Sequence, residues 1–209
     1  MIPFRLGMMF IAAVLLGTAG CKSISDISTS LLSLEKMEFR LAGIQDMRLA
    51  GVGMSSVAAV SDLSIQDALA LTTAFQRRSL PTTFVLKVEA RNPNTGGAGK
   101  RSSPLKLTAL NWRLIIDGVP TVAGDLDRPI EIPGTQDVAI IPITVSIDLY
   151  RFFAEQGYDK ILNLAMALGG KQGSTARVQL DAKPSVEAPF GSLTYPGRIT
   201  IVDSEFRQR

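Results

Sequence analysis

The residues that could carry chemistry are few in this chain of 209 residues. It contains no histidine and a single cysteine, Cys21. Histidine is the side chain most used for acid–base catalysis near neutral pH, and histidine and cysteine are the usual zinc ligands. Paired carboxylates or a serine–lysine pair could still do catalysis, but neither forms a recognisable motif. Asp125 and Asp127 could begin a calcium loop, yet no further acidic ligands follow at the required spacing. The composition favours a protein that is not an enzyme and has no cofactor.

The residues around Cys21 indicate a role for this cysteine in export and anchoring. Arg5 is followed by an apolar run over residues 6–16, and a small-residue triplet ends at Gly20. A basic start, an apolar run and small residues before a cleavage site are the parts of a secretory signal peptide. The arrangement resembles a bacterial lipoprotein signal. That resemblance implies cleavage between Gly20 and Cys21 and covalent lipid on the Cys21 sulfur.

Two other interpretations of this segment are open. The apolar run is shorter than the roughly 20 residues that span a bilayer, which makes a permanent transmembrane anchor the weaker one. Thr18 stands where lipoproteins usually have leucine, which leaves an ordinary cleaved signal with a free thiol as the other. A lone thiol is a liability in an oxidising compartment, so acylation is the better explanation. Lys22 replaces the aspartate that favours inner-membrane retention, so we expect an outer-membrane anchor facing the periplasm.

The rest of the chain divides into a tether and one main domain. Residues 1–20 form the expected signal peptide, and residues 21–34 form a lipidated, serine-rich and threonine-rich tether without a sustained period. Residues 35–206 form the domain. Without Arg5, the 22 basic residues become 21, against 19 acidic residues. This nearly neutral balance argues against nucleic acid as a partner.

Strict alternation of apolar residues over residues 84–91 predicts a half-buried strand. It ends at Asn92-Pro93-Asn94, which is a candidate recognition loop. The favoured alternative is a structural corner of the sandwich, in which these side chains form hydrogen bonds with the backbone. The apolar phase of residues 105–116 changes near Ala109, which predicts a bulged strand. Asp117-Gly118 then predicts a type I′ turn into a partner strand over residues 119–123.

Other strands are expected on both sides of this region. Residues 35–40 and 47–54 are typical of short strands, with Gly43 and Gly51 at turns or at places of close backbone approach. The segment 130–148 contains an apolar run interrupted by Pro142, which indicates an edge strand or a bulge. Residues 175–188 and 193–206 predict two final strands.

Two helices are predicted between the strands. Ser64 starts a capping pattern for a helix over residues 65–77, and Arg77 and Arg78 complement the dipole at its end. Asp148 caps a helix over residues 149–168, which Gly157 kinks or divides. Its apolar stripe suits a hydrophobic core, but a helix laid on a sheet can leave a groove. The groove candidates are Phe152, Phe153, Ile161, Leu164 and Leu168. Strands with two helical insertions predict a mainly β sandwich with helices against its open edges.

The order of the central motifs carries a family resemblance. The strand 84–91 with Asn92-Pro93-Asn94, the strand ending at Asp117-Gly118, and Ile132-Pro133-Gly134-Thr135 before an apolar strand resemble the late-embryogenesis-abundant (LEA) group 2 domain and the related water-stress and hypersensitive-response (WHy) domain. The resemblance spans about residues 35–206. It implies an immunoglobulin-like or fibronectin type III-like antiparallel β-sandwich and no catalytic residues. A structural or binding role, often in stress protection, is what it suggests.

Three functions follow as hypotheses. The first is a membrane-anchored envelope lipoprotein whose LEA type 2-like domain protects or binds apolar or membrane components without catalysis. The second is a periplasmic carrier of lipid-like ligands, held between the 149–168 helix and the sheets. The third is an assembly subunit that binds another envelope protein through a sheet edge.

Overall fold

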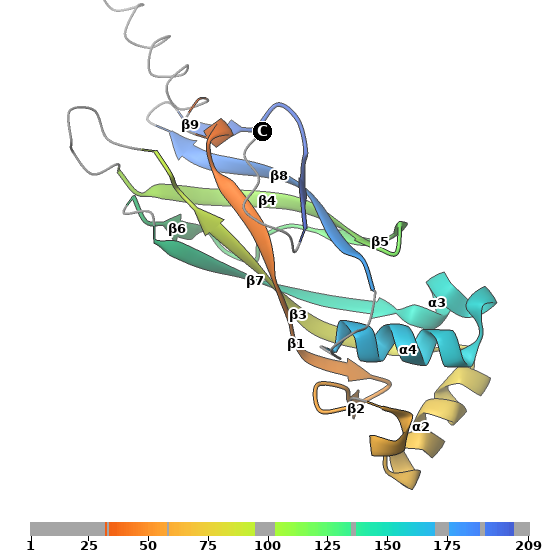
Figure 1. Ribbon diagram of the computed structural model, residues 1–209. Coiled ribbons are helices and arrows are strands. Elements are labelled where there is room, and N and C mark those ends of the chain that lie inside the picture. The colour runs from red at the N-terminus through yellow and green to blue at the C-terminus, as the bar shows by residue number, and fades with distance from the viewer. Residues whose placement is uncertain are drawn as a thin grey trace, which may run out of the picture.

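The chain folds as a mainly β, antiparallel sandwich with helical insertions (Figure 1). The computed structural model describes residues 32, 34–57, 59–94, 103–134, 137–169, 176–188 and 191–202. One sheet has the order β2 (Val52–Gly53), β1 (Glu38–Leu49), β3 (Pro81–Arg91) and β7 (Val138–Asp148). The other has the order β10 (Ile199–Ile201), β8 (Val178–Ala188), β4 (Leu105–Ile116) and β5 (Val119–Gly124), with β6 (Ile130–Ile132) also paired to β4 and β9 (Gly191–Thr194) to β8.

Alternation along the strands builds the core between the two sheets. In β3 and β7, every second side chain is buried, and the two strands pair in register from Pro81 with Asp148 to Arg91 with Val138. The strand predicted over residues 84–91 is therefore confirmed. Burial of these aliphatic rows against the other sheet supplies the main stabilising term, since free energy scales with the apolar area removed from water.

The bulge in β4 is also confirmed. Its pairing with β8 shifts register between Leu107 and Ala109, and the buried row changes from Leu107 to Leu110, Trp112, Leu114 and Ile116. Asp117 and Gly118 adopt φ values of 49° and 82°, the positive pair that a type I′ turn requires. The turn connects β4 to β5 as predicted.

Two strand predictions are corrected. The segments 35–40 and 47–54 were expected as separate strands, but Glu38–Leu49 is one strand. The strand stays continuous because the register of its pairing with β3 shifts after Leu41 and after Gln45. These bulges accommodate Gly43 and Asp46, which both have positive φ. Gly51 does lie at a turn, the one between β1 and β2. The last predicted strand, 193–206, is divided into β9 and β10, because Tyr195–Arg198 leave the sheet.

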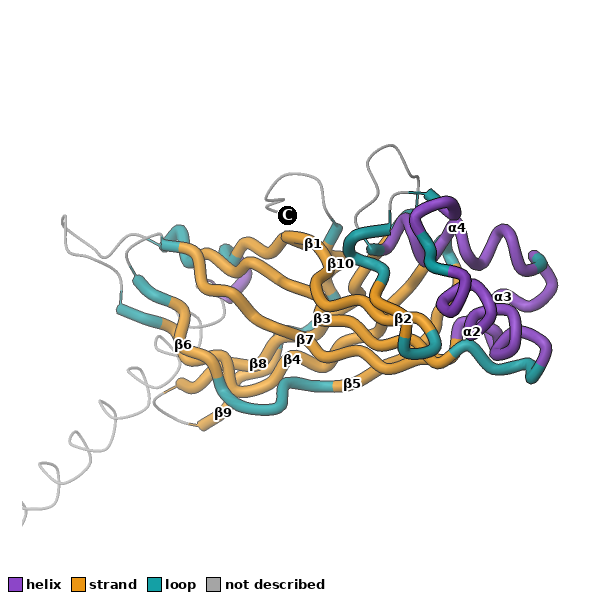
Figure 2. Tube along the Cα trace, turned by 90° about the horizontal axis from the view of Figure 1, so that it is seen from below, coloured by secondary structure: helices purple, strands orange, loops and turns teal. Residues whose placement is uncertain are grey.

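The helices that follow β1 lie together at one end of the sandwich rather than along its open edges (Figure 2). They are the 3₁₀ turn η1 (Val60–Asp62), α2 (Ile65–Gln76), α3 (Leu149–Phe153), the 3₁₀ turn η3 (Ala154–Gln156) and α4 (Tyr158–Leu168). Gly157, at φ 84°, divides the predicted 149–168 helix. The ring of Phe75 in α2 makes edge contacts with Tyr150 and Tyr158, and so joins the three α-helices. No helix in the described segments is both long and apolar enough to cross a bilayer.

Candidate functional site

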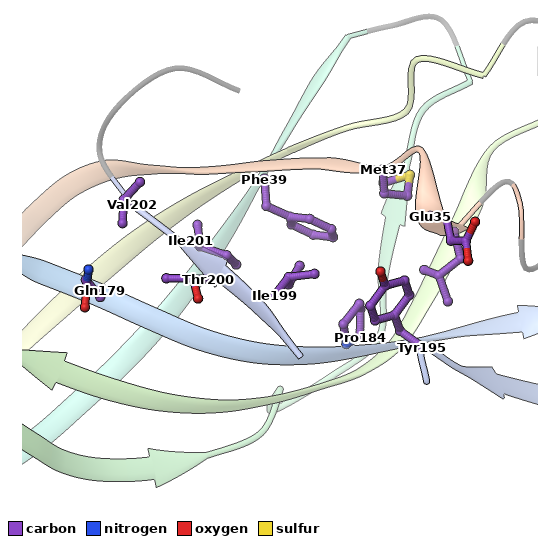
Figure 3. Close-up of a pocket in the computed structure, with 11 residues that line it drawn as sticks. Glu35, Met37, Phe39, Gln179, Pro184, Tyr195, Ile199, Thr200, Ile201 and Val202 are labelled. Atoms are coloured by element: carbon purple, nitrogen blue, oxygen red, sulfur yellow. The ribbon is translucent and has the colours of Figure 1, made fainter. Parts of the chain in front are cut away.

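A hollow of about 290 Å³ lies where the chain enters the sandwich (Figure 3). The turn before β1, the first half of β1, β8 and the segment around β10 form its walls. The side chains of Phe39, Ile199 and Tyr195 converge on it in Figure 3. The full lining consists of Leu34, Glu35, Met37, Phe39, Gln179, Pro184, Tyr195, Ile199, Thr200, Ile201 and Val202.

Pro184 explains why the hollow forms at this place. The outer side of β8 pairs with β10 over residues 180–182 and with β9 over residues 185–188. Between them lies Pro184, which has no backbone N–H to donate to a partner strand. The chain leaves the sheet here, although the Tyr195 N–H donates to the Pro184 carbonyl at 2.9 Å. The gap between β9 and β10 therefore stays open toward β1.

The same region is closed on its other side by a single backbone bond between the sheets. The Leu41 N–H donates to the Val202 carbonyl at 2.9 Å, which joins β1 to the residue after β10. Met37, Phe39 and Ile201 are buried, Ile199 and Tyr195 are half-buried, and Glu35 is exposed at the surface. The hollow is thus lined by apolar side chains together with polar groups, and one carboxylate lies at its edge.

The lining contains polar as well as apolar groups. Among the described residues, the hollow is lined by one charged side chain, Glu35, and by no cysteine, histidine or serine. A nucleophile and a base within hydrogen-bond reach are what acyl or phosphoryl transfer requires. In the described part of the chain, no cluster of three or more acidic, histidine or cysteine side chains is placed to hold a metal ion.

Asn92-Pro93-Asn94 forms a structural corner. Asn92 is 1% exposed, and its Oδ1 accepts from the Asn94 N–H at 3.1 Å and from Asn94 Nδ2 at 2.7 Å. Asn92 Nδ2 donates to the Ser103 carbonyl at 3.3 Å, so the side chain holds the ends of the 92–103 connection together. The alternative interpretation as a recognition loop has no support from these contacts.

Replacing Asn92 with alanine (Asn92→Ala) is expected to lower the free energy of unfolding by about 2–3 kcal/mol. The change removes three hydrogen bonds at a buried site and leaves the Asn94 N–H without this acceptor. Urea unfolding followed by circular dichroism measures it. Asn94→Ala is the matched control, because it keeps the two bonds of Asn92 to the Asn94 N–H and the Ser103 carbonyl, and it should cost about 1 kcal/mol or less. Equal effects of the two changes would contradict this role for Asn92.

Asp117 and Gly118 also have structural roles. Asp117 Oδ1 accepts from the Arg177 N–H at 2.8 Å, and the Asp117 N–H donates to the Arg177 carbonyl at 2.9 Å. The turn is therefore held to the residue that precedes β8, and it is remote from the lining of the hollow.

The carboxylate of Asp125 serves the bulge in β4 rather than a calcium ion. Asp125 Oδ1 accepts from the Leu110 N–H at 2.7 Å and from the Leu126 N–H at 2.8 Å. Its carbonyl accepts from Trp112 Nε1 at 3.2 Å. A second hollow, of about 310 Å³, lies between this loop, β5 and β7, and Trp112 lines it.

The candidate groove residues lie mainly in the core. Phe153, Ile161, Leu164 and Leu168 are buried in the main hydrophobic cluster, and Phe152 is partly buried against it. None of the five lines the hollows described here. The interpretation of the stripe as core packing is confirmed.

Gly20 and Cys21 lie outside the described residues. Leu34, expected at the end of the tether, is 2% exposed and lines the hollow, so the domain begins before residue 35. The hollow itself was not predicted. Its signals in the sequence were Pro184 within a strand and Pro196-Gly197 shortly after it, both of which break strand pairing.

One surface ion pair has a pKa consequence. The Glu187 carboxylate accepts a hydrogen bond from Lys106 and attracts its charge, which raises the pKa of Lys106 above its ordinary value. Both side chains are exposed, and they connect β4 to β8 away from the hollow. Exposed pairs of this kind contribute little to stability.

Comparison with known proteins leaves the family open. No family model matches the chain, and no curated protein matches it. A protein from Archaeoglobus fulgidus, known from a crystal structure, is 11% identical over 77% of this chain and 91% of its own, with a TM-score of 0.33. A protein from Arabidopsis thaliana, known from a solution structure, is 16% identical over 61% of this chain and 75% of its own, with a TM-score of 0.33. Similarity at this level carries no argument about function.

Proposed function

We propose that this chain is a non-catalytic lipoprotein of the cell envelope whose sandwich domain binds a small apolar group in the hollow between β1 and β10. In this proposal, acylated Cys21 ties the chain to the outer membrane, and the domain faces the periplasm. The domain resembles the LEA group 2 and WHy domains, which suggests a structural or stress-protective role. The observation that carries the proposal is the hollow of about 290 Å³, whose lining combines apolar side chains such as Phe39 and Ile199 with polar groups.

The size and lining of the hollow define what it can take. Ligand sites are mostly apolar clefts of about 300–1,000 Å³ with a few polar groups, and this hollow lies at the lower limit. Phe39, Ile199 and Ile201 offer apolar contact, and the Tyr195 ring adds an aromatic wall. Glu35 at the edge disfavours a second negative charge nearby. We therefore expect a neutral or cationic molecule with an apolar portion, such as part of a neutral lipid.

The location of the hollow is consistent with an anchored protein. Leu34 and Glu35 line it and directly follow the segment that we expect to act as a tether. In a lipoprotein anchored at Cys21, this end of the sandwich would lie nearest to the membrane. An apolar recess at that end would have lipids as its nearest neighbours.

Sheet-edge assembly, the third hypothesis, is weakened by two prolines. β5 and β7 each form one end of the described strand order, opposite β10 and β2, and they contain Pro120 and Pro142. A proline cannot donate a hydrogen bond to an added strand, and prolines on edge strands are a common protection against edge pairing. The hollow is therefore the better candidate for binding.

A variant that fills the hollow tests the proposal. The full-length protein is purified from membranes, and the retained apolar molecules are counted by native mass spectrometry and solvent extraction. Ile199→Trp places an indole in the recess and is expected to lower occupancy about tenfold, which corresponds to about 1.4 kcal/mol. Ile115→Trp is the matched control, since Ile115 is also a half-buried isoleucine on a strand of the same sheet but does not line the hollow.

The proposal predicts different results for the two variants. Wild type and Ile115→Trp should retain the same molecule, and Ile199→Trp should lose it while melting within a few degrees of wild type. If the wild-type protein carries no apolar molecule, or if Ile199→Trp retains as much as the control, the hollow is not a binding site.

A further inference from the structure

The outer face of α2 is unusually apolar for a helix at a protein surface. Ile65 is 89% exposed and Leu69 is 67% exposed. The exposed residues of this helix include no charged side chain; they are Ile65, Gln66, Leu69, Ala70, Thr72 and Gln76. A surface helix normally turns a polar face to water, so an aliphatic face of this kind indicates an interaction surface.

A shallow hollow of about 610 Å³ lies along the same helix, between Gln66 and Arg77. Leu69 and Thr73 of α2 line it, together with Ala50 and Pro81 from the adjoining strand ends. Ile65, at the start of the helix, does not line it. The surface therefore has an aliphatic knob, Ile65, at the start of α2 and an apolar recess along the rest of the helix.

Charged side chains flank α2, with an acidic residue before its first turn and basic residues after its last turn. Asp62 lies in the turn before the helix, and Arg77 and Arg78 directly follow it. Arg77 also lines the recess. Among the described residues, no ion pair involves Arg77 or Arg78. The knob end is thus flanked by an acidic side chain, and the recess end by basic ones.

We propose that α2 is the contact surface of a twofold-symmetric dimer of this chain, in which the two copies of α2 pack antiparallel. With Leu69 on the twofold axis, Ile65 of one copy faces Thr73 of the second copy, because both lie four residues from Leu69. The end of α2 that Arg77 follows in one copy then lies beside the start of α2, which Asp62 precedes, in the other. In each half of the interface, Ile65 of one copy packs against the recess of the other, and the basic end of one helix lies near the acidic end of the other. The same contacts occur twice, as a self-complementary interface requires.

A second copy fits these features better than an anionic membrane does. Aliphatic side chains that insert into a bilayer are usually accompanied by lysine and arginine. Here the most exposed aliphatic residue, Ile65, lies near Asp62 and Asp67, which anionic headgroups would repel. α2 also lies at the opposite end of the sandwich from the start of β1, where the chain enters (Figure 1).

Disulfide mapping tests the register directly in the full chain. Antiparallel helices in close contact bring residues on the twofold axis within reach of a disulfide, for which Cα atoms must approach to about 4.4–6.8 Å. Leu69→Cys should therefore give covalent dimers under mild oxidation. Ile65→Cys alone should not, because its two copies would lie eight residues, or about 12 Å, apart along the helices. Ile65→Cys combined with Thr73→Cys should crosslink efficiently.

Each variant is also made with Cys21→Ala, so that any disulfide through Cys21 is recognised. This parallel set keeps the test independent of acylation, and a failure here leaves the proposal for the β1–β10 hollow untouched.

A measurement of mass supplies the second arm. The wild-type chain in detergent should sediment as two chains. Leu69→Asp should weaken association about a hundredfold, whereas Ile140→Asp, an exposed isoleucine on β7, should leave it unchanged. Arg77→Asp should weaken the dimer, and addition of Asp62→Arg should restore it. Single-chain wild-type mass, crosslinking of Ile65→Cys as strong as that of Leu69→Cys, or α2-dependent binding of a monomer to phosphatidylglycerol vesicles would overturn the proposal.

Discussion

Replacement of Cys21 with alanine (Cys21→Ala) is expected to abolish acylation of the chain and, with it, stable membrane anchoring. Each buried methylene of an acyl chain contributes about 0.8 kcal/mol, and a single chain already gives a binding constant of about 10⁴ M⁻¹. Two or more chains on one cysteine make release negligible. Alkyne-palmitate labelling of cells that express the tagged full chain, followed by fractionation and intact-mass analysis of the N-terminus, measures both effects.

Lys22→Asp is the matched control for this experiment. It changes the neighbouring residue but leaves the cysteine, so acylation should persist, and the protein should shift toward the inner membrane. A wild-type chain that takes up no label, or a Cys21→Ala chain that is still labelled, would refute the lipoprotein assignment. The intact mass also shows whether the signal was removed, which distinguishes an anchored mature protein from one held by an uncleaved signal.

Features that depend on neighbouring residues were predicted well. The alternation in β3, the Ser64 cap of α2 and the positive-φ pair Asp117-Gly118 each depend on chemistry within a few residues. Ser64 Oγ accepts from the Asp67 N–H at 3.1 Å, as a capping pattern requires. Predictions of this kind succeed because steric limits and hydrogen bonds between neighbouring residues determine these conformations largely without tertiary contacts.

The prediction of two strands in the β1 region failed for a related reason. Gly43 and Asp46 break the apolar period, and local rules take such a break as a turn. In the structure, β3 pairs along nearly the whole of β1, and bulges take up the irregular residues. Whether a break becomes a turn or a bulge depends on the partner strand, which a single sequence does not identify.

The hollow could not be predicted from the sequence either, because it also depends on which segments of the chain pack together. Its walls come from residues 34–39 and from residues 179–202, which are far apart in the chain. They meet where β1 approaches β10, at the bond between the Leu41 N–H and the Val202 carbonyl and the packing of Phe39 and Ile201 in the core. Individual apolar residues such as Phe39 and Ile199 are ordinary members of strands, and only the missing pairing at Pro184 turns their neighbourhood into a site.

A second large effect is expected at Asp148, which the sequence identified only as a helix cap. Its Oδ1 accepts from the Leu80 N–H at 2.7 Å and from the Tyr150 N–H at 3.0 Å, and its Oδ2 accepts from Ser79 Oγ at 2.8 Å. The carboxylate therefore joins the start of β3 to the junction between β7 and α3. These two junctions lead into the helical end of the sandwich.

Asp148→Ala should lower the free energy of unfolding by about 3–5 kcal/mol. Hydrogen bonds to a charged group are worth about 1.5–3 kcal/mol each, and a lost cap costs about 1 kcal/mol, although such terms do not add fully. Leu80 is 1% exposed, so its N–H would lose its acceptor away from water. Small domains are stable by only about 5–15 kcal/mol, so the change should remove a large part of the total.

Urea unfolding of the full chain, followed by the fluorescence of Trp112, measures this loss. Asp159→Ala is the control, since Asp159 is an exposed aspartate in the first turn of α4, and its loss should cost about 0.5 kcal/mol or less. Asp148→Asn keeps one acceptor oxygen and removes the charge, so it should fall between the other two. If Asp148→Ala unfolds at the same urea concentration as Asp159→Ala, the carboxylate does not join the two junctions, and α2 is held in place by the burial of Leu71 and the contacts of Phe75 with Tyr150 and Tyr158.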